Sequence, residues 1–140
     1  MSRETVYAAL AAKLSAIHGV KTFSRKMIIW DQLTPEHKPA IILVQTGETY
    51  AYQAENLPPK RTLESILLLY TAPAQNESNP AKIVNDVLDN LGAALAPDRG
   101  GKQTLGGLCS HCRIEGAGPM EDGALDLQGV TIKKISILLP

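Results

Sequence analysis

Two stretches of the chain repeat apolar residues every three or four positions, which is the spacing of one face of an α-helix. In residues 2–18 the repeating positions are Val6, Leu10, Leu14 and Ile17. In the second stretch they are Val84, Val87, Leu88, Leu91 and Leu95. Asn79 and Pro80 stand where an N-cap and a first turn belong, so the second helix is predicted to begin there.

Elsewhere apolar residues alternate with polar ones or form short aliphatic runs, as they do in β-strands. The predicted strands cover residues 40–46, 61–71, 108–115 and 130–139, with a weaker one at 22–29. In the last strand the apolar phase shifts across Lys133-Lys134, which predicts a β-bulge or a lysine-protected edge. The order of elements predicts an α+β fold, a mostly antiparallel mixed sheet of about four to five strands with two main helices on one face.

Two connections are predicted to be long, residues 47–60 and residues 116–129. Connections of more than about 12 residues are uncommon in compact domains and are usually functional or disordered. Tyr50 and Tyr52 alternate with small or polar neighbours. The first connection is therefore either a mobile loop or an extended β-hairpin arm that offers tyrosines to a partner, and the sequence leaves both open.

Charge and composition exclude some classes of protein but do not identify the function. The 140 residues hold 14 basic and 14 acidic side chains, so the formal net charge is zero and no specific nucleic-acid binding is expected. The first residues lack the apolar run of a secretory signal, and the aliphatic runs are too short to span a bilayer. We expect one domain over residues 1–140, cytoplasmic where it is made, with no membrane partner.

The segment Cys109-Ser110-His111-Cys112 brings together residue types that bind metals. A C-x-x-C pair is half of a zinc site or a redox pair, but the sequence has no second pair. Within a predicted strand the two cysteines are expected to point to opposite faces and to behave as small apolar residues. The run Gly100-Gly101-Lys102-Gln103-Thr104 fails as a phosphate loop because Gln103 takes the Ser/Thr position. We expect no enzymatic activity, no cofactor and no metal.

A series of short segments, spread over nearly the whole chain, carries a family resemblance. They are Ser2-Arg3-Glu4-Thr5-Val6-Tyr7-Ala8-Ala9-Leu10, Ser24-Arg25 with Trp30, Lys38-Pro39-Ala40, Gln45-Thr46-Gly47-Glu48, Leu69-Tyr70, Ala94-Leu95-Ala96-Pro97, Gln103-Thr104-Leu105-Gly106-Gly107-Leu108 and Ile114-Glu115-Gly116. In their order and spacing they resemble small tail proteins of long-tailed bacteriophages and prophages, in the tail-terminator or tail-completion group.

The resemblance implies an α+β subunit that assembles into a homo-oligomeric ring, typically a hexamer. Such a ring caps the head-proximal end of the tail tube, ends its growth and provides the head-joining surface. The implied partners are further copies of the chain, the tail-tube protein and the head–tail connector or neck proteins. The protein is then expected in the host cytoplasm during assembly and in the virion tail afterwards.

Exposure arguments select five candidate contact residues for these partners: Tyr50, Tyr52, Arg61, Glu121 and Asp122. Two other functions stay open. One is a different neck or head–tail joining protein of the virion. The other is a cytosolic metal- or redox-binding module that uses Cys109 and Cys112.

Overall fold

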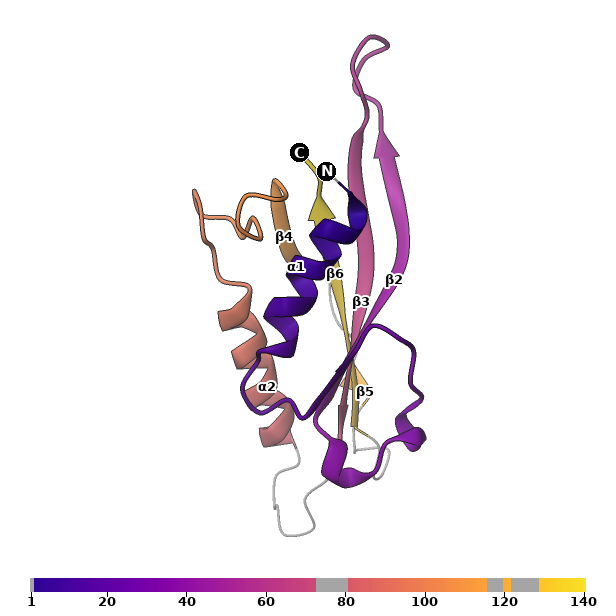
Figure 1. Ribbon diagram of the computed structural model, residues 1–140, viewed down its shortest axis with the longest axis vertical. Helices are drawn as coiled ribbons and strands as arrows, with labels where there is room; N and C mark the ends of the chain where they lie inside the picture. Colours follow the sequence, from indigo (N-terminus) through magenta and orange to yellow (C-terminus); the bar gives the residue numbers. More distant parts are fainter. Residues whose placement is uncertain (1, 73–80, 116–119, 122–128) are drawn as a thin grey trace.

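A computed structural model of the chain describes residues 2–72, 81–115, 120–121 and 129–140. Its elements are α1 (Arg3–Ser15), β1 (Thr22–Ser24), two short 3-10 turns (Trp30–Gln32 and Pro35–His37), β2 (Ala40–Ala51), β3 (Lys60–Thr71), α2 (Ala81–Ala94), β4 (His111–Glu115), β5 (Met120–Glu121) and β6 (Gly129–Leu138). The strands form one sheet in the order β1-β2-β3-β6-β4, and β5 also pairs with β6 (Figure 1). Among the described strand pairs only β1 and β2 are parallel, so the predicted α+β class with a mostly antiparallel sheet is confirmed.

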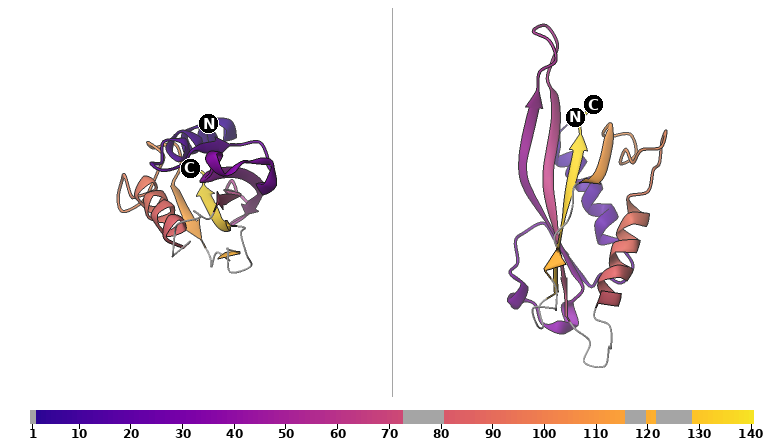
Figure 2. Two further views of the ribbon diagram at one scale, coloured as in Figure 1. Left: turned by 90° about the horizontal axis from the view of Figure 1, so that it is seen from below. Right: turned by 180° about the vertical axis from the view of Figure 1, so that it is seen from behind.

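Both helices cover the same face of this sheet, as the sequence predicts (Figure 2). Helix α1 begins after the N-cap Ser2, whose hydroxyl accepts a hydrogen bond from the backbone N–H of Thr5 at 3.0 Å. The apolar stripes of the two helices pack on the sheet in the main core. Its fully buried members include Val6, Leu10, Leu14, Leu67, Ile135 and Ile137. The residues predicted to open the second helix, Asn79 and Pro80, lie outside the described residues.

A second, smaller core lies on the opposite face of the sheet. Ala40 and Ile42 alternate with the main-core residues of β2, and they pack with Leu68 and Tyr70 of β3. The segment between β1 and β2 covers them: Tyr70 Oη donates to the carbonyl of Ile28 at 2.8 Å. Trp30 packs here and donates its indole N–H to the carbonyl of Thr71 at 3.2 Å.

The two cores explain the phase shift that the sequence shows in its last strand. Strand β6 pairs with β3 without any register shift, so the predicted bulge is absent from that pairing. Its other edge pairs with β4 as far as Lys134 and with β5 from Thr131. Val130 and Ile132 pack in the second core, whereas Ile135 and Ile137 pack under the helices. The apolar phase changes because the covered face changes along the strand.

The long first connection is a β-hairpin. Strand β2 continues to Ala51 and β3 begins at Lys60, so only residues 52–59 lie between the strands. The bulge of the sheet lies in β2, where the register shifts between Gln45 and Gly47. Of the two interpretations of residues 47–60, the extended hairpin arm is confirmed. Most of the second long connection, residues 116–129, lies outside the described residues.

Candidate functional site

The end of the β2–β3 hairpin projects from the domain as an arm, which we define as residues 50–61. The last pair between β3 and β6 is Thr62 with Leu138, so beyond it the chain is a two-stranded ribbon with the pairs Tyr50–Arg61 and Ala51–Lys60. Figure 1 shows the arm extending past both chain termini. A two-stranded ribbon on its own is marginally stable in water, and packing against another surface would stabilise it.

The arm carries three of the large apolar side chains that the described part of the chain exposes. Tyr50 is 47% exposed, Tyr52 is 73% exposed and Leu57 is 57% exposed. Exposed tyrosines are typical of protein interfaces, because the ring supplies apolar contact and the hydroxyl supplies a hydrogen bond. Sequence reasoning selected both tyrosines, and the structure brings them together with Arg61 in one arm. Leu57 was missed because a single leucine among polar residues has no periodic signal.

The base of the arm is tied to the first turn of α1 by Arg3. Its guanidinium donates to both carboxylate oxygens of Glu48, with the shortest contact at 2.8 Å, and to the hydroxyl of Tyr50 at 3.0 Å. These hydrogen bonds from Arg3 lower the pKa of Glu48, and the nearby charge of Arg61 adds to the effect. One of the two predicted contact tyrosines therefore also fixes the arm to its own domain.

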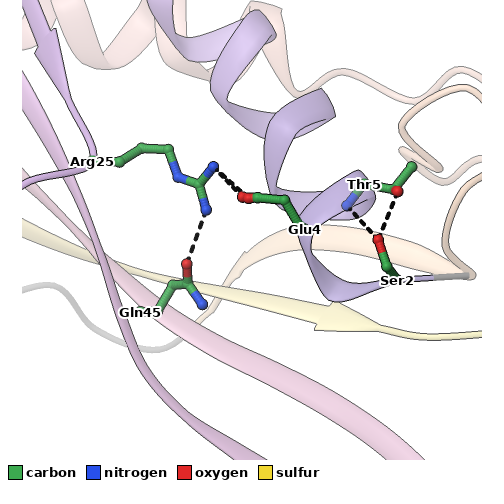
Figure 3. Close-up of polar contacts among 5 residues, drawn as sticks. All are labelled: Ser2, Glu4, Thr5, Arg25 and Gln45. Atoms are coloured by element: carbon green, nitrogen blue, oxygen red, sulfur yellow. Dashed lines mark hydrogen bonds and ion pairs between the residues drawn. The ribbon is translucent and has the colours of Figure 1, made fainter.

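A second tie joins α1 to β2, the strand that holds Glu48, on the other side of the bulge between Gln45 and Gly47 (Figure 3). The guanidinium of Arg25 donates to both carboxylate oxygens of Glu4 in α1 and, at 3.0 Å, to the amide oxygen of Gln45 in β2. It also lies 5.8 Å from the centre of the Tyr7 ring. Glu48 and Gln45 flank the bulge, so the two ties hold the strand at the point where it bends toward the arm.

The structure does not place all five predicted contact residues on one surface. Arg61 is half-buried at the arm's base, and its carbonyl accepts a hydrogen bond from Leu139 at 3.0 Å. Glu121 of β5 pairs with Val130 near the start of β6, whereas Leu138 at the other end of β6 lies beside the arm. Eight residues of strand separate these two positions, about 27 Å. Glu121 is therefore remote from the arm, and Asp122 lies outside the described residues.

The two cysteines are buried in the main core. Cys109 lies in the turn before β4, because the strand begins at His111 rather than at residue 108 as predicted. Both side chains therefore reach the same core, and the prediction that they point to opposite faces is wrong. Burial raises the pKa of Cys109 to about 11 and that of Cys112 to about 12. Such thiols stay protonated and pack as small apolar groups, which agrees with the structural interpretation of the motif.

The glycine-rich segment before β4 is a closed turn. The carboxylate of Asp98 accepts hydrogen bonds from the backbone N–H groups of Thr104 at 2.7 Å and Gly106 at 3.1 Å. Burial opposes the charged carboxylate, but these hydrogen bonds outweigh it and lower the pKa of Asp98. Gly106 has a φ of +76°, a conformation that glycine adopts without strain. The N–H groups of Thr104 and Gly106 are thus bound to Asp98.

A pocket opens on the sheet face that the helices leave free, next to the β2 bulge. Its volume is about 320 Å³, and it is lined by Thr46, Glu64, Ser65, Ile66, Glu115, Lys134, Ile135 and Ser136. Glu64 and Lys134 are exposed, and neither forms an ion pair within the described residues. The pocket thus combines two apolar side chains, Ile66 and Ile135, with charges of both signs, Glu64 and Lys134.

Comparison with known proteins assigns no family to this architecture: no family model matches the chain, and no curated protein matches it significantly. Among the described residues, no group of three or more His, Cys, Asp or Glu side chains is placed to hold a metal ion. No described helix is both long enough and apolar enough to cross a membrane.

Proposed function

We propose that the protein is a structural subunit of a long-tailed phage tail, which forms a homo-oligomeric ring at the head-proximal end of the tail tube. The ring ends tube growth and offers a docking surface to the neck proteins. The observation that carries this proposal is the arm, a projecting hairpin with two exposed tyrosines and a base held by Arg3. The ordered segments that resemble tail-terminator proteins supply the class of assembly.

A free strand edge gives the proposal further support. Strand β1 pairs with β2 only at residues 40–42, so from Leu43 to Ala51 one edge of β2 has no strand partner within the described chain. An edge of this length is a place for another chain to bind. The free edge of β2 and the arm lie on one side of the sheet, and β4 lies on the other side. Contacts between unlike surfaces of identical copies close into rings when the rotation allows.

The ring would act mechanically, by covering the tube end, and would use no catalytic group or cofactor. The buried thiols, with pKa values of about 11 and 12, do not favour the alternative of a metal- or redox-binding module. A different neck protein remains the nearer alternative.

Labelling of purified tails with an antibody against the chain tests the proposal. Label at the head-proximal tip of tubes of uniform length supports it. Tails of normal length from a phage that lacks the gene would overturn the terminator role. Label on the neck of filled heads would favour the alternative neck protein.

A further inference from the structure

The pocket on the open sheet face has the size and lining of a receptor for one aromatic side chain. At about 320 Å³ it lies at the lower end of the range of ligand-binding pockets. Ile66 offers apolar contact, while Glu64 and Ser136 offer oxygen atoms that can accept a hydrogen bond. A tyrosine, with an apolar ring and a hydroxyl, matches this mixed lining.

The arm carries the side chains that complement the pocket. Tyr52 is the most exposed large apolar side chain of the described residues, at 73%. Glu55 and Lys60 flank it in the arm, both exposed and without an ion pair in the described chain. The pocket presents Lys134 and Glu64. The arm therefore offers one acid and one base, and the pocket offers Lys134 and two carboxylates, Glu64 and Glu115, of which Glu115 is already paired with Arg113.

The arm cannot fill the pocket of its own domain. The pocket lies at the pair Gly47–Glu64, and Tyr52 lies five residues further along the same extended ribbon. That separation is about 17 Å, directed away from the sheet. Tyr52 can therefore enter such a pocket only on another molecule, and a second copy of this chain supplies the matching groups.

We propose that the arm of one copy docks on the open sheet face of the next, with Tyr52 in the pocket, Glu55 facing Lys134 and Lys60 facing Glu64. This inference rests on the proposed ring function and names the contact that closes the ring. Arm and pocket are different surfaces, so the contact is heterologous and repeats around the ring.

Charge reversal with rescue tests the contact. The wild-type chain is compared with Glu55→Lys, Lys134→Glu and the double variant by sedimentation equilibrium, and Lys21→Glu, an exposed lysine beside β1, is the matched control. Each single reversal is expected to raise the concentration of half-assembly about fivefold or more, and the double variant should return to within about twofold of wild type. Tyr52→Ala should raise it at least about tenfold.

The outcomes separate this inference from the function on which it rests. Rescue in the double variant with an unaffected Lys21→Glu control supports the contact. If wild type forms rings and the two reversals weaken assembly additively or have no effect, the arm–pocket contact is wrong while the ring stands. If wild type forms no oligomer alone or on purified tail tubes, the proposed function fails and this inference fails with it. Each variant is expected to fold, because all the changed side chains are exposed, and denaturation curves check this.

Discussion

Shortening the arm separates its role in assembly from its role in the fold. Residues 52–59 can be replaced by Asn-Gly, the two residues that best form a type I′ turn between paired strands. Ala51 and Lys60 then close the hairpin directly, and the ties of Arg3 to Glu48 and Tyr50 are kept. The change removes Tyr52 and Leu57 but no buried side chain.

The expected effect on stability follows from loop closure. The connection is reduced from eight residues to two, which halves its length twice. Each halving lowers the entropic cost of closing the loop by about 0.6 kcal/mol, so the free energy of unfolding should rise by about 1.2 kcal/mol. Pro58 and Pro59 already stiffen the native connection, which makes this an upper value. The segment loses one internal backbone hydrogen bond, from Leu57 to Ala54. We expect a free energy of unfolding equal to that of wild type or up to about 1 kcal/mol higher.

Urea denaturation and sedimentation velocity are the two assays for this variant. We expect an unchanged or higher denaturation midpoint together with loss of the oligomer. A loss of more than about 1 kcal/mol in stability would mean that the arm is part of the fold, which refutes the reasoning from its exposure. Wild-type assembly by a stable variant would show that the arm is not the contact.

Three further predictions follow from the described contacts. Cys109 and Cys112 should react with a thiol reagent far more slowly in the native protein than in urea, because burial raises the pKa of both; equal rates would contradict their placement. Leu10→Ala should lower the free energy of unfolding by about 2–5 kcal/mol, measured by urea denaturation, since Leu10 is fully buried; a loss below about 1 kcal/mol would place it outside the core. The pKa of Glu48 is lowered from 4.5 by Arg3, so this pair stabilises the fold above pH 4.5 and is lost as the pH falls through the lower native pKa. Glu48→Gln should therefore flatten the acid limb of stability against pH, and an unchanged limb would argue against the pairing.

Much of the architecture could be predicted from side-chain periodicity. The helical stripe through Leu10 and Leu14 and the aliphatic runs of β2 and β3 each have one dominant covered face, and their placement is confirmed. Periodicity reports only which face is covered. In β6 the first apolar residues pack in the second core and the later ones pack under the helices, on the opposite face of the sheet. This change of face produces the same sequence pattern as a bulge. The actual bulge, between Gln45 and Gly47, lies where neither face is densely apolar, so it leaves no pattern to read.

The contacts at the arm's base could not be predicted from the sequence. Arg3 and Glu48 are 45 residues apart, and Arg25 and Glu4 are 21 apart. Charged residues at such separations carry no local signal of pairing. The resemblance covers the segments that hold all four, but it implied no pairing between them. The prediction for the cysteines was wrong for a related reason. Because of the turn that is hydrogen-bonded to Asp98, β4 begins at His111 instead of residue 108, and the apolar pattern of the segment does not show this later start.

The central claim is that this chain is a ring-forming structural subunit, and its mass in solution tests that claim most directly. Sedimentation velocity of the purified protein over a wide concentration series, alone and with purified tail tubes, is the measurement. We expect a closed species of about six subunits, or the same species formed on the tube ends when the free protein is dilute. A monomer at every concentration that also fails to sediment with the tubes would contradict it.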